Sequence, residues 1–209
     1  MRFGNDVLAQ AARLAGGRCV GRHPPSPSEP TAPGGPDRLV AGRGGPFLGP
    51  GRFWGAQTGP NPTDRGKNGS KHHVLTEANG IPLATSVTGA NCADVTQLLP
   101  LVDAVPPLSG QRGRPRRTPQ CLHADKAYDS ALHRLALWQR GIEPRIPKRG
   151  YEEPPGLGVC RWVVERTISW LHQYRRLRVR YERRADIHQA FLTLGCILVC
   201  HKCLQNSFC

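Results

Sequence analysis

The sequence predicts a single α/β domain that follows an unstructured N-terminal segment. From residue 71 onward, segments typical of strands and helices follow one another in the order strand, strand, helix, strand, helix, strand, helix. Residues 1–53 differ, because Pro and Gly are frequent there and large apolar residues are few. Such a segment buries too little surface to offset the entropy lost on ordering, so we predict that it is disordered. Residues 54–209 then form the domain.

The composition indicates a polyanionic partner. The chain of 209 residues has a formal net charge of +14 and a pI of about 10.1, and such a charge attracts nucleic acid. A ribosomal protein or a protein of membrane surfaces has the same charge balance. Because there is no run of about 18 apolar residues and no apolar segment typical of an export signal, we expect a cytoplasmic protein without a membrane partner. The eight cysteines are then expected as reduced thiols.

Each predicted element rests on a local signal. Asn79 and Gly80 form a strong hairpin signal between two strands. Asp94 is placed to cap the helix that follows it, and Gly141 is placed to end the next helix in the left-handed conformation. His72 and His73 are adjacent in a strand, so they are expected to point to opposite faces and not to converge on a metal ion. The predicted strands are residues 71–77, 81–87, 121–124 and 142–146, and the predicted helices are residues 95–105, 130–140, a long helix around Glu165, and 185–204.

Two carboxylates are placed for metal chemistry. Asp125 follows the short apolar run 121–124, where a strand would end, and Glu165 lies in the long basic helix. Magnesium takes oxygen ligands, keeps several waters and needs only one or two protein carboxylates. Two such ions can hold the attacking and leaving oxygens of a phosphodiester. A carboxylate at a strand end and another on a following helix can hold a divalent ion between them.

The helix around Glu165 is predicted to be amphipathic and to continue to Arg176. At about 100° per residue, Glu165 shares a narrow sector with Arg161, His172 and Arg176. The acid on this face could bind metal while its neighbours hold a nucleic-acid backbone. The simpler interpretation is a solvated face with an Arg161–Glu165 pair four residues apart. The apolar side is formed by Val163, Val164, Ile168, Trp170, Leu171 and Tyr174.

Lysines and arginines gather around both carboxylates. The run 111–117, QRGRPRR, looks like an arm for a narrow minor groove, which attracts inserted arginine. An exposed, solvated linker is an equal alternative, because phosphate attraction needs only charge. The candidate DNA-binding residues are Arg114, Arg116, Arg117, Lys126, Arg161, His172, Arg175 and Arg176.

Several ordered motifs resemble the DDE transposases of insertion sequences. The segment RWVVE with His172 seven places after Glu165 is similar to their Y-(2)-R-(3)-E-(6)-K signature, with His in place of the usual Lys. The segment DKAYD at 125–129 looks like the second-aspartate motif. The runs 59–84 (GPNPTDRGKNGSKHHVLTEANGIPLA) and 176–188 (RLRVRYERRADIH) are very similar to the insertion-sequence-five (IS-five) group. The resemblance covers about residues 54–209 and is specific, because the motifs agree in order.

This resemblance implies a ribonuclease-H-like domain that cuts and joins DNA strands with Mg²⁺ or Mn²⁺. It assigns Asp125 and Glu165 as catalytic residues and metal ligands. Members of the family also carry a strand with a first catalytic aspartate just before the GPNP loop. No such strand is recognisable here, and Asp37, the remaining candidate, has glycine-rich flanks that favour a strand poorly. We therefore expect a ribonuclease-H-like domain that lacks its first strand.

Two functions follow from these expectations. The first is a transposase that binds transposon ends and target DNA and catalyses metal-dependent strand cleavage and transfer. The second is a truncated or frameshifted relative that binds DNA through its basic surface and lacks catalysis. The expected partners are DNA, with self-association or complementation by an upstream-frame product. An aspartate on an upstream strand is the feature that separates the two functions.

Overall fold

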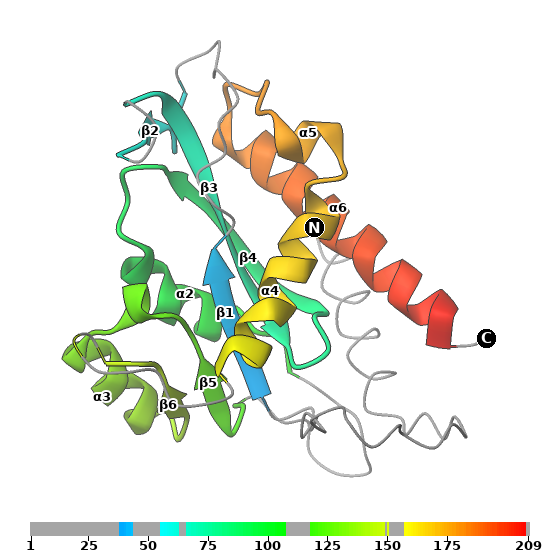
Figure 1. Ribbon diagram of the computed structural model, residues 1–209. Coiled ribbons are helices and arrows are strands. Elements are labelled where there is room, and N and C mark those ends of the chain that lie inside the picture. Colours follow the sequence, from blue (N-terminus) through cyan, green and yellow to red (C-terminus); the bar gives the residue numbers. More distant parts are fainter. Residues whose placement is uncertain are drawn as a thin grey trace.

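The computed structural model describes residues 38–43, 55–62, 66–107, 118–148, 150 and 157–207. These residues form a mixed β-sheet with helices packed on its two faces (Figure 1). The strands are β1 (Arg38–Arg43), β2 (Gly59–Pro60), β3 (Asn68–Glu77), β4 (Pro82–Gly89), β5 (Cys121–His123) and β6 (Glu143–Arg145). The helical elements are η1 (Asp94–Gln97), α2 (Leu98–Asp103), η2 (Lys126–Tyr128), α3 (Ala131–Gln139), α4 (Leu157–Leu171), α5 (Arg175–Arg178) and α6 (Ala185–Ser207).

The strand β1 lies in the middle of the sheet. It pairs antiparallel with β3, where Val40 faces Thr76, and parallel with β5, where Val40 faces His123. β4 pairs with the other side of β3 and β6 pairs with β5, which gives the order β4-β3-β1-β5-β6, with the short β2 beside the start of β3. The expectation of a domain without its first strand is therefore wrong. Residues 38–43 of the segment predicted to be disordered belong to the sheet.

Burial explains why this weak strand sequence is extended. Leu39 and Ala41 are buried in the core on one face of the sheet, and Val40 is buried in the core on the other. A short continuous apolar run suits a strand that is covered on both faces. Pairing with neighbours on both sides outweighs the low strand propensity of Gly42. The position of the domain boundary at residue 53 stays a prediction.

The predicted hairpin between β3 and β4 is confirmed. Gly80 in its turn has φ of 88°, a conformation that glycine adopts without steric cost. The turn also contacts α4, because Thr167 Oγ1 donates a hydrogen bond to the Gly80 carbonyl at 2.7 Å. This contact fixes one end of β3 to the helix that carries Glu165.

Two apolar cores cover the two faces of the sheet. The first packs α2 and α3 against the sheet, and the second packs α4, α5 and α6 against the opposite face. Figure 1 shows α4 crossing the sheet beside β1. The first core contains Leu39, Leu75, Leu98, Leu101, Leu122 and Leu137, and the second contains Val40, Val74, Val164, Ile168, Leu171, Leu177 and Leu192. His72 and His73 point to opposite faces of the sheet, as predicted, because His72 contacts His188 of α6 whereas His73 Nε2 is 2.7 Å from Thr88 Oγ1 on β4.

The helices α2 and α3 occur where the sequence predicts helices, but the bounds and the cap of the first differ from the prediction. α3 is confirmed, and Gly141 follows it with φ of 73°. The helix predicted at 95–105 is instead the short turn η1 followed by α2. Asp94 does not cap it, because its carboxylate is buried and accepts from Lys71 Nζ at 3.1 Å. The ion pair with Lys71 thus takes the place of a capping hydrogen bond.

The helix α6 confirms the predicted C-terminal helix and extends it. The stretch Ala185–Gln205 is long and apolar enough to cross a membrane by length and composition, with a mean hydropathy of 1.4 in its most apolar window. One side of α6 packs on the sheet, as in the core helix of a folded domain. Cys196 and Cys200 are buried there, and burial raises the pKa of the Cys200 thiol to about 12. These two cysteines therefore serve packing.

Candidate metal and DNA site

Asp125 lies directly after β5, as predicted. Its Oδ1 accepts a hydrogen bond from the backbone N–H of Ala127 at 2.8 Å, so the carboxylate caps the turn η2. The second carboxylate oxygen forms no hydrogen bond with a described residue. The half-buried side chain is thus held by one oxygen, and the other oxygen can serve a ligand.

The residue of β1 at the level of Asp125 is a glycine. Val40 faces His123 in the parallel pair of β1 and β5, so two residues further along both strands Gly42 comes level with Asp125. The strand β1, with the sequence RLVAGR, contains no Asp or Glu. The central strand is present, but it brings no carboxylate to this level. Asp37, the candidate for that ligand, lies outside the described residues.

Glu165 is exposed on α4. The neighbouring Val164 and Ile168 are buried against the sheet, so the Glu165 carboxylate points away from the core. Within the described residues, no side chain forms an ion pair with Glu165, and no group of three or more His, Cys, Asp or Glu side chains could hold a metal ion. The proposal that Asp125 and Glu165 share one ion therefore stays a prediction.

The helix α4 ends at Leu171, earlier than its periodicity predicts. Its end is tightened, because the Tyr174 N–H bonds to the Leu171 carbonyl three residues back at 3.2 Å. Tyr174 is then extended, with φ of −80° and ψ of 117°, and it begins the separate helix α5. The expectation that Arg176 shares a sector of one helix with Glu165 is therefore wrong, because the break at Tyr174 separates them. His172 precedes the break, and its N–H still bonds to the Ile168 carbonyl four residues back at 2.9 Å.

His172 lies among other histidines. It is half-buried, and its ring centroid is 6.4 Å from that of His72 on β3. Burial, and then the charge of Arg178, lower the pKa of His172, which disfavours the charged form that would attract phosphate. Its contact with DNA stays a prediction that the geometry does not favour.

A buried hydrogen-bonded group joins β3 to the start of α6. Nε2 of His72 is 2.8 Å from Nε2 of His188, and Nδ1 of His188 is 3.4 Å from Oε2 of Glu182. If the carboxylate accepts from His188 Nδ1, then His188 Nε2 must accept from His72 Nε2–H, because a neutral imidazole donates from one nitrogen. Burial, followed by the charges of His188 and His172, lowers the pKa of His72 to about 3. Burial, followed by the charge of Arg180, also lowers the pKa of His188, so both rings are neutral near pH 7.

Arg180 joins three segments that are distant in sequence. Its guanidinium donates to the carbonyls of Ala56 at 2.9 Å and Gln57 at 3.0 Å, to Ser70 Oγ at 2.5 Å and to the Glu182 carbonyl at 2.9 Å. The planar fork of arginine reaches several acceptors at once, which lysine cannot do. We call Arg180, Glu182, His72 and His188 the Arg180 cluster.

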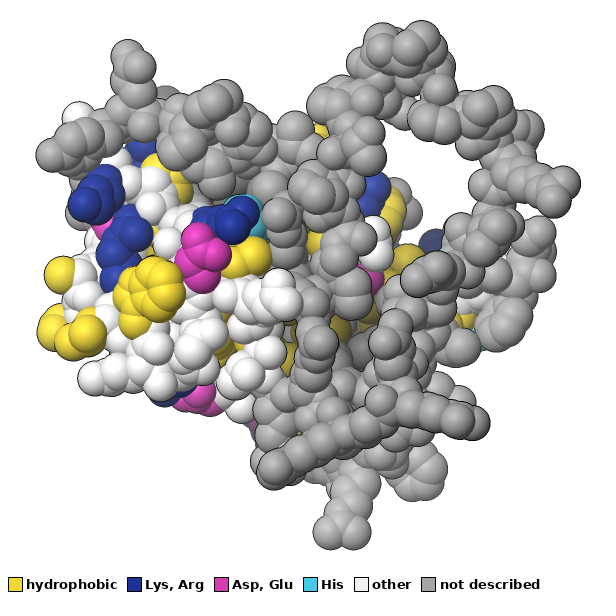
Figure 2. Space-filling model, turned by 90° about the horizontal axis from the view of Figure 1, so that it is seen from below, with side chains coloured by type: hydrophobic (Ala, Val, Ile, Leu, Met, Phe, Trp, Pro, Cys, Tyr) yellow, Lys and Arg dark blue, Asp and Glu magenta, His cyan; other side chains and the backbone are white. Residues whose placement is uncertain are grey.

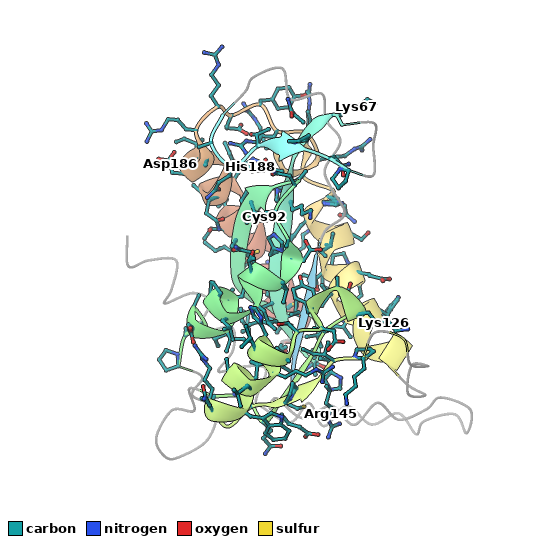
Figure 3. All side chains as sticks on the ribbon, turned by 90° about the vertical axis from the view of Figure 1, so that its left-hand side faces the viewer. Lys67, Cys92, Lys126, Arg145, Asp186 and His188 are labelled. Carbon is teal, nitrogen blue, oxygen red and sulfur yellow. The ribbon has the colours of Figure 1, made fainter. Side chains whose placement is uncertain are left out.

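The predicted DNA-binding cations lie in different surroundings. Arg175 and Arg176 of α5 are exposed, and Arg176 pairs with Glu182 at 2.6 Å. Figure 3 shows Lys126 at the height of the N-terminal half of α4, and His188 at the upper end of the sheet. On the face seen from below, Figure 2 shows further Lys and Arg side chains, which lie between apolar side chains. The structure describes neither Arg114, Arg116 and Arg117 nor the side chain of Arg161.

Sequence reasoning missed the Arg180 cluster as a unit. Its members Arg180, Glu182 and His188 all fall in the run 176–188, which stands out in the sequence only through its resemblance to the transposases. The residues that they contact, such as His72 and Gln57, are more than one hundred positions away. Local periodicity has no signal for such contacts. The alignment of Gly42 with Asp125 across the sheet follows only from the pairing of β1 with β5.

Comparison with known proteins gives a consistent family assignment. A profile of the family described as Transposase DDE domain matches residues 44–200. A Burkholderia cepacia protein described as "Putative transposase for insertion sequence element IS402" is 57% identical over 208 residues, which cover 99% of this chain and 98% of that protein. A Neisseria meningitidis serogroup B protein described as "Transposase for insertion sequence element IS1106" is 30% identical over 129 residues, which cover 57% of this chain and 40% of that protein. The mixed sheet with helices on both faces is consistent with the ribonuclease-H-like fold that this domain implies. The chain belongs to the DDE transposase family of insertion sequences.

Proposed function

We propose that this protein is a transposase of the IS-five type, which binds DNA and cleaves and joins its strands with a divalent metal ion. The observation that supports this most is the placement of the two candidate carboxylates. Asp125 ends the strand next to β1, and Glu165 lies on the helix that packs across β1. A carboxylate at a strand end and a second on a covering helix suit one hard cation.

Asp125 and Glu165 are the residues that would hold Mg²⁺ or Mn²⁺. The donor set fits such an ion, because both groups supply carboxylate oxygens and Asp125 keeps one oxygen free of hydrogen bonds to described residues. When bound, the ion would lower the pKa of an attacking water and stabilise charge on a phosphodiester. The chain's own contribution is to fix Asp125 through the Ala127 N–H and to leave Glu165 accessible.

DNA would be held mainly by its phosphates. The exposed arginines of α5, Lys126 and the run 111–117 supply the cations for such contacts. Binding of this kind is strongly dependent on salt and largely independent of base sequence. A protein with this role works on bacterial DNA, which places it in the cytoplasm at the nucleoid.

The glycine at position 42 favours a second candidate function. Without a carboxylate on β1, the described residues offer two ligands for an ion that then keeps most of its waters, so metal binding would be weak. The chain alone would then bind DNA and cleave it slightly or not at all. A product read from an upstream frame could supply the missing acid by complementation.

Replacement of Gly42 tests both candidates in one assay. Cleavage of duplex DNA in Mg²⁺ is measured for the chain as it is, for Gly42→Asp and for Gly42→Asn, which adds nearly the same volume without charge. We expect slight cleavage by the chain itself, clear cleavage by Gly42→Asp, and none above background by Gly42→Asn. Glu165→Gln added to Gly42→Asp should abolish the gain.

The outcomes separate the two candidates. Strong cleavage by the unmodified chain would overturn the incomplete site and require a third ligand elsewhere. Folded Gly42→Asp protein that binds DNA and does not cleave it would favour the non-catalytic function. Failure of all forms to bind DNA at low salt would reject both.

A further inference from the structure

The segment from α5 to the start of α6 carries an exposed aromatic ring among arginines. From Arg175 to Asp186 it has six arginines and two acids. Tyr181 is 42% exposed, and the guanidinium carbons of Arg175 and Arg176 lie 6.0 Å and 5.6 Å from its ring centroid. Both distances are within the range of cation–π attraction. We call Tyr181, Arg175 and Arg176 the Tyr181 platform.

The residues on either side of Tyr181 are fixed by the fold. The Arg180 guanidinium donates to two carbonyls of the segment before β2, and the largely buried Glu182 carboxylate accepts from Arg176 at 2.6 Å. Because both neighbours bond to the protein, the backbone that carries Tyr181 is held in place. A ring that is already positioned loses little conformational entropy when a ligand binds to it.

The charges of the segment suit an anionic ligand. Both of its acids form ion pairs with arginines of the same segment. Arg175 and Arg178 are exposed on α5, and neither forms an ion pair with a described residue. The segment therefore offers positive charges next to an open aromatic ring. Phosphates together with flat rings are the chemistry of a nucleic acid strand.

The ring favours bases that are not stacked within a duplex. Paired bases stack on one another and present only their edges to a side chain, and separating them costs free energy. A base in a single strand has its faces accessible and stacks on an aromatic ring whatever its identity. The exposed face of Tyr181 therefore fits a single strand better than a duplex.

We propose that the Tyr181 platform binds single-stranded DNA, with one base stacked on the Tyr181 ring and the neighbouring phosphates held by Arg175 and Arg178. The inference rests on the proposed function, because strand cleavage is the reaction that leaves unpaired nucleotides. The platform would then retain a strand after its complement has been released.

The platform is separate from the carboxylate pair. Figure 3 shows Asp186 and His188, which follow Tyr181 in the chain, at the upper end of the fold. Lys126, the residue after Asp125, lies lower, beside the N-terminal half of α4. A strand on the platform is therefore a different part of the DNA from the part at the metal site.

A strand without bases separates stacking from charge. Anisotropy with the full chain in EDTA gives the affinity for a short thymidine strand, an abasic strand and a duplex of the same length. We expect Tyr181→Ala to raise the dissociation constant of the thymidine strand about tenfold and to leave that of the abasic strand unchanged. Tyr181→Phe keeps the ring and should bind as the parent does. Arg175→Ala should weaken the binding of both strands.

A second exposed aromatic residue provides the matched control. Trp138 of α3 is 59% exposed, and Trp138→Ala should change none of the three affinities. Circular dichroism melts verify that each variant is folded.

Three results would overturn the proposal. Tyr181→Ala could weaken the thymidine and abasic strands equally, which would exclude stacking, or Trp138→Ala could weaken the thymidine strand as much as Tyr181→Ala does. In the third case Tyr181→Ala weakens the duplex by the same factor as the thymidine strand, which would assign the platform to duplex DNA. The assay contains no metal, so these results leave the cleavage test with Gly42→Asp untouched, whereas a failure of every form to bind DNA would reject the proposed function as well.

Discussion

The Arg180 cluster and the carboxylate pair use charged residues in opposite ways. In the cluster, Arg180 alone donates to Ala56, Gln57, Ser70 and Glu182. In contrast, the carboxylate of Asp125 accepts a hydrogen bond only from the N–H of Ala127 among the described residues, and Glu165 is exposed on α4. The polar groups of the Arg180 cluster form hydrogen bonds within the protein, whereas the carboxylate pair leaves oxygens available for a ligand.

This difference separates residues that hold the fold from residues that are available for chemistry. Buried polar groups are costly when they lose their partners, so the cluster should matter for stability. An exposed carboxylate without a partner contributes little to stability. Both sets lie within motifs shared with the insertion-sequence transposases, so resemblance alone does not tell the two roles apart.

Replacement of Arg180 should give the largest loss of stability. Arg180→Ala leaves the carbonyls of Ala56 and Gln57 without their donor, and we expect a loss of about 3 kcal/mol in the free energy of unfolding. Urea denaturation measures this free energy of unfolding. Arg178→Ala, at an exposed position of α5, serves as the control and should change stability by less than about 0.5 kcal/mol. Similar effects of the two substitutions would show that the cluster does not hold the fold.

Acid should destabilise the protein through the cluster. Because the folded-state pKa of His72 is about 3, below its ordinary value of 6.5, the unfolded chain binds more protons as the pH falls below that ordinary value. Stability is therefore complete above about pH 6.5 and is lost as the pH falls towards 3. Between pH 7 and pH 5 we expect a loss on the order of 2 kcal/mol.

Urea titrations at several pH values, with one matched pair of variants, identify the residue responsible. His72→Gln can still donate to His188 and does not titrate, so its stability should depend less on pH. His201→Gln changes an exposed histidine of α6 and should keep the pH dependence of the parent. Equal pH dependence in all three proteins would exclude His72 as the source.

The basic run 111–117 should affect DNA binding and not stability. Replacing Arg114, Arg116 and Arg117 together by Ala should weaken binding and reduce the slope of log affinity against log salt by about 0.9 for each phosphate that the protein no longer neutralises. The melting temperature should change little, since surface substitutions rarely cost stability. Fluorescence anisotropy with a duplex at several salt concentrations gives the affinity and the slope, and a thermal melt gives the stability. Unchanged affinity at low salt would remove this run from the DNA interface.

Neutralising Glu165 should have the smallest effect on the fold. Glu165→Gln should leave the free energy of unfolding within about 0.5 kcal/mol, because the exposed carboxylate has no ion pair with a described residue. DNA affinity should stay equal or rise slightly, since a negative charge near phosphate is removed. Urea denaturation and the anisotropy assay measure these two values. A large loss of stability would show that Glu165, like the Arg180 cluster, holds the fold.

Elements that depend on neighbouring residues could be predicted from the sequence. The hairpin at Asn79 and Gly80, the helix before Gly141 and the position of Asp125 after β5 all follow from signals within a few residues. The family resemblance added the fold class. It also gave the two carboxylates an expected role in metal binding, which stays a prediction.

The features that sequence reasoning missed depend on distant contacts. β1 is extended because β3 and β5 pair with it on either side, and its glycine gave a misleading local signal. The end of α4 at Leu171 follows from a tightened last turn, which the apolar pattern of the segment does not reveal. The Arg180 cluster assembles residues from β3, the loop before α6 and the start of α6, and it contacts the segment before β2. No local pattern encodes such an assembly.

Asp125 and Glu165 are proposed to share a weakly held divalent ion, because β1 offers no third carboxylate. Direct titration of Mn²⁺, followed by electron paramagnetic resonance of the free ion, measures this without DNA. We expect one weak site in the parent chain, its loss in both Asp125→Asn and Glu165→Gln, and clearly tighter binding in Gly42→Asp with no change in Gly42→Asn. Mn²⁺ binding that is the same in the parent and in both carboxylate variants would contradict the claim.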